Sequence, residues 1–440
     1  MSVLLVEDDP GIALVITAAL EAEAERASAL LMAAAGELLG AIDIERGNLH
    51  PAHRARPGHV GGLQRVVEVR VRHLQVGPAV PAVSHQHARE ALAELEVDLG
   101  VPADAIVMED ASLNTIENIR LVRDLVKARN ISLIHARSRA PAWSALWAAR
   151  QTKIPFVTTY HGVYNAKTAL KRWYNAVMTR GDMVIANSQF TRDHVIAEHG
   201  VDPDKVVAIP RGVDTKRFAP GLITPARLQT LRTAWGIAAD DRRAIILLAG
   251  RLTRWKGQGL LIEAAARLKA TGQDRFIIVM AGDEQGRSGY RAELDAAVDA
   301  AGLTEQVRIV GHCDDMPTAY ALCDVAVAPS LDPEAFGRTA VEPQIMGRAV
   351  IAADHGAARE TVVHGQTGWL AAPGDPDAWA QALNTALEAG VGRRGAMGEL
   401  GRARARKLYS VEAMCEATLA VYVQVLETRA RNAAPRNLGA

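Results

Sequence analysis

Two carboxylates, Glu334 and Glu342, stand eight positions apart on either side of Gly337. The residues after this glycine are expected to begin a helix, and the first N–H groups of a helix have no acceptor within it. Such a turn can hold a phosphate. The carboxylates can accept hydrogen bonds from hydroxyl groups on either side of that phosphate. A sugar nucleotide carries both kinds of group at this spacing, so the segment predicts a site for that class of ligand.

A second segment, residues 250–257, carries two cations between an apolar run and a helical pattern. The apolar run is typical of a buried parallel strand, and ligands of open parallel sheets bind at the carboxyl ends of the strands. Arg251 and Lys256 are therefore placed to neutralise a diphosphate. Solvated loop cations would have the same local sequence. The coincidence with the segment around Glu334 favours the binding interpretation.

Strand and helix patterns alternate through the C-terminal half of the chain. Short apolar runs predict strands at 244–249, 276–281, 307–310, 324–329 and 349–353, and helical spacing predicts helices at 259–270 and 291–301. This alternation with short connections is typical of a doubly wound parallel sheet.

The same alternation occurs upstream. It predicts helices at 115–127 and 142–150, strands at 131–134, 155–159 and 183–186, and a hinge between two α/β domains at 209–214. Polar residues follow each strand: His135, Arg137 and Arg139 the first, His161 the second and Asn187 the third. The arginines can bind a phosphorylated or acidic acceptor, or form a solvated basic loop. Asn187 can line the ligand site or help to cap the following helix.

The first 110 residues fit this scheme poorly. Residues 2–6 predict a strand and 11–39 a long Ala-rich helix, whereas 50–87 are rich in His, Arg, Pro and Val without clear periodicity. A fragment of a front domain, a poorly ordered arm and a disturbed reading frame would each produce this pattern.

Composition limits the classes of function. The 440 residues favour two or three domains, and 50 Lys+Arg offset 50 Asp+Glu, which argues against a nucleic-acid partner. The overall charge gives no indication of a strongly anionic membrane either, although the charge can be unevenly spread, as near Arg137. Cys313, Cys323 and Cys415 are widely separated, which fits a reducing compartment. No apolar run reaches the roughly 18 residues that span a bilayer, and no signal peptide is recognised. We expect a cytoplasmic protein, with peripheral contact at the inner face of a membrane left open.

Residues 131–425 resemble the retaining glycosyltransferases of family four. The resemblance rests on the Glu334–Glu342 segment together with residues 210–214, 250–257, 321–330, 355–360 and 365–370. These motifs are jointly specific and cover about two thirds of the chain. The family has the GT-B architecture, in which two Rossmann-like doubly wound domains face each other across a cleft. The resemblance therefore implies an α/β protein of this class with an irregular N-terminal domain.

The resemblance also implies roles for individual residues. Arg251 and Lys256 would hold the donor diphosphate, Glu334 the donor sugar and Glu342 the ribose. His161 would face the sugar from the other domain and donate a hydrogen bond rather than act as a nucleophile. The remaining donor contacts would come from Gly250, Val310, Gly311, Phe336, Gly337 and Arg338, and the acceptor contacts from His135, Arg137, Arg139 and Asn187. No metal or cofactor is required. The donor would be a UDP-, GDP- or ADP-sugar and the acceptor a saccharide or glycolipid.

The front of the chain departs from the family pattern. Residues 61–67 resemble the Gly-Gly loop near the diphosphate, but no clear strand precedes them. Residues 3–9 resemble the opening of a response-regulator receiver, without a recognisable phosphoacceptor aspartate. Residues 100–118 are similar to part of the envelope-associated family DUF218.

These observations predict four regions and one function. The regions are an irregular or mosaic segment (1–110), an acceptor domain (111–213), a donor domain (214–405), and a C-terminal helix and tail (406–440). The function is retaining transfer of a sugar from a nucleotide-sugar, in envelope polysaccharide or lipopolysaccharide assembly. The alternatives are a catalytically impaired nucleotide-sugar-binding protein and a receiver-type signalling protein.

Overall fold

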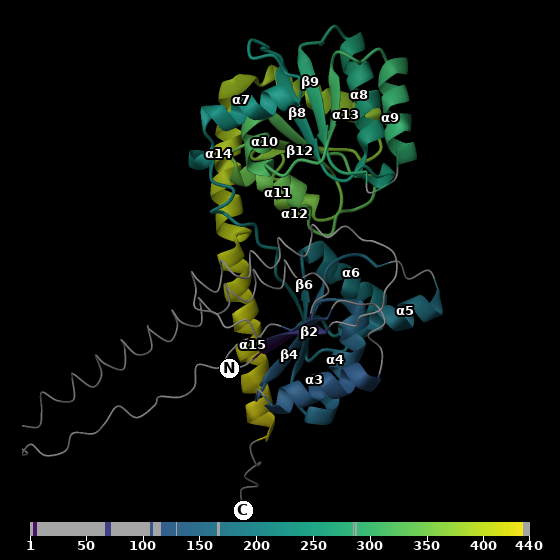
Figure 1. Ribbon diagram of the computed structural model, residues 1–440, viewed down its shortest axis with the longest axis vertical. Coiled ribbons are helices and arrows are strands. Elements are labelled where there is room, and N and C mark those ends of the chain that lie inside the picture. The colour runs from purple at the N-terminus through teal and green to yellow at the C-terminus, as the bar shows by residue number, and fades with distance from the viewer. Residues whose placement is uncertain are drawn as a thin grey trace, which may run out of the picture.

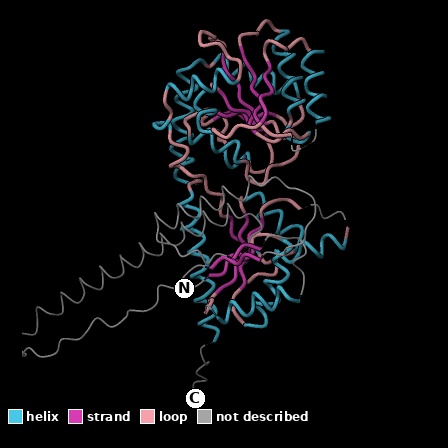
Figure 2. The backbone as a smooth tube through the Cα atoms, viewed as in Figure 1, coloured by secondary structure: helices cyan, strands magenta, loops and turns pink. Residues whose placement is uncertain are grey.

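Two lobes, each built around one parallel β-sheet, lie one above the other along the longest axis of the molecule (Figures 1 and 2). The computed structural model describes residues 3–6, 67–71, 106–108, 116–128, 130–164, 168–284, 286 and 288–433.

The C-terminal lobe contains a six-stranded sheet of order β10-β9-β8-β11-β12-β13, in which all neighbours pair in parallel. Its strands are β8 (Ala244–Ala249), β9 (Phe276–Ala281), β10 (Val307–Gly311), β11 (Val325–Ala328), β12 (Ala349–Ala353) and β13 (Gly368–Ala371). Its helices are α7 (Pro225–Ala234), α8 (Gln258–Ala270), α9 (Ser288–Ala300), α10 (Met316–Leu322), α11 (Arg338–Ile345), α12 (Ala358–Thr361), α13 (Pro376–Glu388) and α14 (Gly390–Leu408). The strand order reverses between β8 and β11, as in a doubly wound sheet.

Helices of this lobe cover both faces of its sheet. Alternate residues of a strand point to opposite faces, so Leu248 packs in one core, with Leu261 of α8 and Trp379 of α13. Its neighbour Leu247 packs in the other core, with Val341 of α11. Both faces of this sheet are therefore covered by residues from one continuous stretch of chain.

The N-terminal lobe contains a seven-stranded parallel sheet of order β3-β2-β1-β4-β5-β6-β7. Its strands are β1 (Val3–Val6), β2 (Val67–Val71), β3 (Ile106–Met108), β4 (Leu133–Ala136), β5 (Phe156–Tyr160), β6 (Met183–Ala186) and β7 (Val206–Ala208). Its helices are α3 (Ile116–Ala128), α4 (Arg139–Thr152), α5 (Ala169–Asn175) and α6 (Gln189–His199).

The two faces of this second sheet are covered from different parts of the chain. On one face, Ile134 and Val184 pack in a core with Leu146 of α4. On the other, Leu133 and Ile185 pack with residues of α15 (Val411–Ala433). Figure 1 shows α15, in yellow, leaving the upper lobe and running down along the lower one. The end of the chain thus completes the lobe in which the chain begins.

Two segments join the lobes, and they are tied to each other. The N–H of Val213 donates to the carbonyl of Tyr409 at 2.8 Å, and the N–H of Val411 donates to the carbonyl of Val213 at 3.3 Å. A Cβ on Gly212 would lie 2.6 Å from Cα of Val411, so glycine permits this approach. The segment predicted as a hinge does connect the lobes.

Most predicted strands are confirmed. Four of them have the predicted bounds: β8, β9 and β12 in the C-terminal lobe and β6 in the N-terminal lobe. Strands β7 and β13 were not predicted. Strands β2 and β3 were not predicted either; β2 lies within residues 50–87, which show no clear periodicity, and it pairs with β1 and β3. The Gly-Gly segment and the predicted helix at 11–39 lie outside the described residues.

The strand predicted at 2–6 is confirmed as β1, which lies between β2 and β4. Three strands from the first 110 residues therefore belong to the sheet that also carries His135. The boundaries of the four predicted regions remain predictions. Within the described residues, no helix is long and apolar enough to cross a bilayer.

Candidate functional site

Lys256 and Glu334 meet beyond the carboxyl ends of β8 and β11. The ammonium Nζ of Lys256 lies 2.5 Å from Oε1 of Glu334, and the hydroxyl of Ser330 donates to the same oxygen at 2.7 Å. The side chains of Lys256 and Glu334 are 13% and 17% exposed, so the pair is partly withdrawn from water. The cation also lies 4.2 Å from the ring centroid of Trp255. Two residues that the sequence placed 78 positions apart thus form one charged centre.

Two glycines make the backbone conformation around this charged centre possible. Gly337 precedes α11 with φ +80°, a conformation that side chains with a Cβ rarely adopt, and a Cβ there would lie 3.7 Å from Cβ of Glu334. Gly257 has φ +76°, and a Cβ there would lie 1.9 Å from the carbonyl oxygen of Pro329. The start of α11 therefore lies beside Glu334, and its first N–H groups have no acceptors within the helix.

Glu342 lies one turn into α11, as predicted, and is held by two side chains. An oxygen of its carboxylate pairs with Nη2 of Arg338 at 2.9 Å, and the Tyr320 hydroxyl donates to the other oxygen at 3.2 Å. Burial raises the pKa of Glu342, while Arg338 and Tyr320 offset part of the rise. This places a carboxylate with restricted solvent access one turn into α11, the helix that begins beside Glu334.

The other predicted donor residues lie around the same strand ends in different ways. Gly250 lies against Lys256, whose Cδ is 3.6 Å from a Cβ built on the glycine. The Arg251 carbonyl accepts a hydrogen bond from the side chain of Gln258, and Arg251 is exposed to solvent. Val310 and Gly311 end β10, where the carbonyl of Gly311 accepts from Gly282 at 2.7 Å.

Phe336 differs from the other predicted donor residues because its side chain belongs to the core. It is 4% exposed and packs edge-on against Tyr409, with ring centroids 5.6 Å apart. Only its backbone is therefore suited to contact a donor.

His161 lies opposite this loop, in the N-terminal lobe. A Cβ on the next residue, Gly162, would lie 3.8 Å from Cβ of Ala335, directly after Glu334. The His161 carbonyl accepts from Nδ2 of Asn187 at 2.8 Å. Burial lowers the pKa of His161 well below its usual range, and the nearby cations Arg137 and Arg211 lower it further. The imidazole is therefore neutral near pH 7 and lies in a positive field.

His135 is fully buried. Its Nδ1 lies 2.5 Å from the hydroxyl of Tyr422 on α15, and its Nε2 lies 2.7 Å from the hydroxyl of Thr159. Burial, followed by the charge of Arg137, lowers the pKa of His135 well below its usual range. These contacts give no support to the prediction that His135 touches an acceptor. They instead connect the strand end to the C-terminal helix.

The predicted basic residues of this lobe are not a solvated loop. Arg137 is 5% exposed and its charge acts on both His135 and His161. Arg139 donates to Oδ1 of Asn175 at 3.0 Å, and its guanidinium lies 4.2 Å from the ring centroid of Tyr164. Asn187 is buried, and its Oδ1 accepts no hydrogen bond within the described part of the chain.

Glu360 forms a direct contact between the lobes that the sequence reasoning missed. Its two carboxylate oxygens accept from the N–H groups of Gln189 and Phe190, at 2.8 and 2.7 Å. These N–H groups open α6, so the carboxylate of one lobe caps a helix of the other and meets the positive end of its dipole. Next to it, the hydroxyl of Thr191 lies 3.3 Å from the carbonyl of Ala335. Glu360 belongs to the motif at residues 355–360, which was the available signal.

His355, in the same motif, was also not predicted to contribute. Its Nε2 lies 2.9 Å from the carbonyl of Ser330, whose hydroxyl contacts Glu334. Within the described residues, no group of three or more His, Cys, Asp or Glu side chains is arranged to hold a metal ion. The predicted independence from metal remains a prediction.

Two family models match the chain. The model described as "Glycosyl transferases group 1" matches residues 232–404, and the model described as "Glycosyltransferase Family 4" matches residues 60–217. A D-inositol 3-phosphate glycosyltransferase of Kineococcus radiotolerans is 30% identical over 337 residues, which cover 70% of this chain and 75% of the relative. The protein of the same name from Xylanimonas cellulosilytica is 30% identical and covers 64% and 69%.

Solved structures agree with these matches. A glycosyltransferase from Rickettsia africae superposes with a TM-score of 0.73 at 26% identity, covering 97% of this chain and 98% of that one. Anabaena HepE, in a complex with UDP, superposes with a TM-score of 0.71, covering 96% and 100%; at 21% identity, this is a likeness of fold. Together with the two parallel sheets, these likenesses confirm the predicted fold class.

Proposed function

Because the chain belongs to the glycosyltransferases of group 1 and family 4, we propose that it transfers a sugar from a nucleoside diphosphate with retention of anomeric configuration. The C-terminal lobe holds the donor. Lys256, Arg251 and the start of α11 take the diphosphate, Glu334 takes sugar hydroxyls and Glu342 takes the ribose. UDP is the first nucleotide to test, since the Anabaena neighbour was crystallised with it.

The chemistry places growing charge on the diphosphate. As the bond between the anomeric carbon and the phosphate oxygen breaks, negative charge accumulates on that oxygen. Fixed cations and helix N–H groups stabilise this charge more than they stabilise the ground state, which lowers the barrier. The acceptor oxygen then bonds to the anomeric carbon from the face that the diphosphate leaves. Its proton passes to a phosphate oxygen.

The acceptor approaches from the N-terminal lobe. His161 is neutral and can donate a hydrogen bond to the sugar, while Arg137 and Arg211 supply the positive field around it. This field favours an acidic acceptor. A phosphorylated polyol is the acceptor to test first, because the matched relatives are named for D-inositol 3-phosphate. A glycolipid of the cell envelope is the second candidate.

One observation carries this proposal. The Lys256–Glu334 pair lies beside the start of α11, and the turn at His161 contacts the residue that follows Glu334. A charge-stabilising centre on one lobe and a hydrogen-bond donor on the other thus meet at one place. Such preorganised charge is what departure of a diphosphate requires.

Binding and turnover together test the proposal. A thermal-shift series with UDP, GDP and ADP should single out one nucleotide, and free ligand at about a hundred times its Kd should stabilise the protein by about 2.7 kcal/mol. Release of that nucleotide should then depend on an added acceptor. Stabilisation without turnover on any acceptor would favour the catalytically impaired alternative. No stabilisation by any of the three would contradict the donor site.

A further inference from the structure

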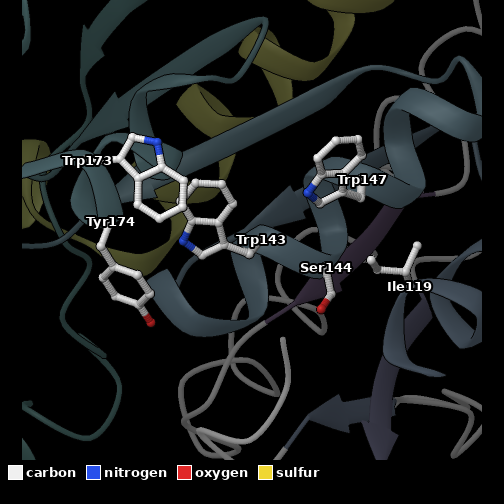
Figure 3. Close-up of a pocket in the computed structure, with 6 residues that line it drawn as sticks. All are labelled: Ile119, Trp143, Ser144, Trp147, Trp173 and Tyr174. Atoms are coloured by element: carbon white, nitrogen blue, oxygen red, sulfur yellow. The ribbon is translucent and has the colours of Figure 1, made fainter. Parts of the chain in front are cut away.

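An aromatic shelf stands on the outer surface of the N-terminal lobe. Leu170, Trp173 and Trp147 are 73%, 54% and 47% exposed, which is unusual for side chains of this size. Figure 3 shows Trp143 and Trp173 side by side and Trp147 apart from them, and all three line a pocket of about 220 Å³. The pocket is lined by Ile119, Trp143, Ser144, Trp147, Trp173 and Tyr174.

The helical spacing explains why these rings share one surface. Trp143 and Trp147 are one turn apart on α4, and Leu170 and Trp173 are one turn apart on α5. The two helices are joined where the rings of Trp143 and Trp173 pack with centroids 4.6 Å apart. This contact fixes the shelf to the lobe. A contiguous apolar patch of this kind on a protein surface usually marks an interaction site.

Cations accompany the rings. The guanidinium of Arg180 lies 5.0 Å from the ring centroid of Trp143, and that of Arg150 lies 5.5 Å from the ring centroid of Trp147. Lys171 is exposed and adjoins Leu170. The chain as a whole has no net charge. Tryptophan combined with Lys and Arg is typical of surfaces that lie at the boundary between lipid headgroups and acyl chains.

We propose that this shelf docks the protein on the surface of an anionic lipid bilayer. Trp147, Trp173 and Leu170 enter the headgroup region, while Arg150, Lys171 and Arg180 contact lipid phosphates. Each cation near such a surface contributes about 1 kcal/mol, and the contribution falls as salt rises.

The pocket also contains the hydroxyl groups of Ser144 and Tyr174, which a saccharide could use. Beyond the pocket, however, Leu170 and the 68% exposed Ile116 add apolar surface that favours lipid. Guanidinium groups already lie near the rings of Trp143 and Trp147. These features favour acyl chains and phosphates over hydroxyl groups.

The position of the shelf links it to the acceptor side of the site. Arg139 begins α4 one turn before Trp143, and it donates to Asn175 at the end of α5. A glycolipid head that rises from the bilayer therefore comes close to Arg139. This link rests on the proposed function, whereas docking itself does not.

Co-sedimentation with vesicles tests docking without donor or acceptor. The full-length protein should bind vesicles of phosphatidylcholine mixed with phosphatidylglycerol, bind phosphatidylcholine alone weakly, and be released by added salt. The double variant Trp147→Ser/Trp173→Ser should bind the anionic vesicles at least about tenfold more weakly. Lys171→Glu should weaken binding to the anionic vesicles but not to vesicles of phosphatidylcholine. Val391→Ser, which changes a 77% exposed apolar residue on α14 of the other lobe, is the matched control and should bind as the wild type does.

Three results would overturn the proposal. The first is absence of wild-type binding to the anionic vesicles. The second is equal binding by the wild type and the double variant when both have the same melting temperature. The third is quenching of Trp fluorescence by soluble oligosaccharides but not by vesicles, which would make the shelf a sugar-binding surface. Since the assay contains no donor, failure of sugar transfer would not produce any of them.

Discussion

The two lobes have the same kind of sheet but complete it differently. The C-terminal lobe covers both faces with helices that follow its own strands. The N-terminal lobe covers one face with its own helices and the other with α15, from the end of the chain. The proposed donor side of the site therefore depends on short, nearby segments. The proposed acceptor side depends on a contact between His135 and Tyr422, 287 positions apart.

Removal of α15 should show the difference in stability between the two lobes most clearly. A chain that ends at Ser410 loses the buried side chains of Val421, Tyr422 and Val425 and exposes the face that they cover. At about 1.5–3 kcal/mol for each large buried side chain, the N-terminal lobe should lose more than about 4 kcal/mol of stability. The C-terminal lobe should keep its stability.

Hydrogen exchange resolved by segment checks this prediction. Strands β4–β6 should exchange rapidly in the truncated chain, while β8–β12 should exchange as in the full chain. Equal protection of both sheets would mean that α15 is dispensable, and the contrast between the lobes would be lost.

Loss of the charged pair should leave both lobes folded and remove turnover. Lys256→Ala or Glu334→Ala should lower kcat at least about 10²-fold, because each removes a group that stabilises the departing diphosphate or holds the sugar. Lys407→Ala, at an exposed lysine in the last turn of α14, is the control. Initial rates with saturating donor provide the measurement, and near-wild-type turnover in either variant would remove the proposed site.

Tyr422→Phe tests the long-range contact by itself. The variant leaves Nδ1 of a fully buried histidine without its partner, which should destabilise the N-terminal lobe by about 1–3 kcal/mol. Denaturant unfolding, followed with probes in each lobe, should show the midpoint falling only for the N-terminal one. A uniform shift in both lobes would indicate that they unfold as one unit.

Glu360→Ala tests how far the lobes depend on each other. Removing the carboxylate that caps α6 should widen the spread of lobe arrangements and lower kcat/KM about fivefold, since a helix cap contributes about 1 kcal/mol. Glu360→Gln, which can still accept one of the hydrogen bonds, should lose less kcat/KM than Glu360→Ala. Glu388→Ala, on an exposed helix end, should keep the wild-type kcat/KM. Small-angle scattering that is unchanged in the alanine variant would argue against a role in holding the lobes.

Acid should destabilise the N-terminal lobe through its buried histidines. Burial lowers the pKa of His135 and His161, so the folded N-terminal lobe binds fewer protons than its unfolded chain. Its stability should be fully present above about pH 6.5 and decline as the pH falls below this value. Glu342 in the other lobe has a raised pKa, so its contribution is present at low pH and is lost as the pH rises.

The pH effect is the smallest of these predictions and needs a comparison within one experiment. Calorimetry of the wild type and of His135→Gln, at about pH 7.5 and about pH 5.5, should show a smaller acid-induced fall in Tm for the variant. Equal falls would mean that His135 titrates at its ordinary pKa.

Sequence reasoning succeeded where neighbours in sequence are neighbours in space. The strands β8, β9 and β12 are continuous apolar runs, and the Glu334 turn lies between a strand and a helix that follow each other directly. It failed where the determinant is distant. Strand β2 has little apolar character of its own beyond alternating valines, and its identity depends on pairing with β1 and β3.

The same limit applies to the site. The pairing of Lys256 with Glu334 follows from two strand ends at one edge of a sheet, which is a rule of topology. The engagement of His135 by Tyr422 follows from no local pattern, because α15 has to be placed first. Glu360 lay in a recognised motif, but its partners are backbone N–H groups of another lobe, which no side-chain pattern reveals.

The return of α15 to the first lobe has a consequence for synthesis on the ribosome. Chains usually acquire structure in the order in which they emerge, but here the half that emerges first lacks one wall until residues 411–433 are made. The half translated second can close before the half translated first. A nascent chain therefore holds an uncovered apolar sheet until residues 411–433 have left the ribosome, and the N-terminal lobe is complete only from then on.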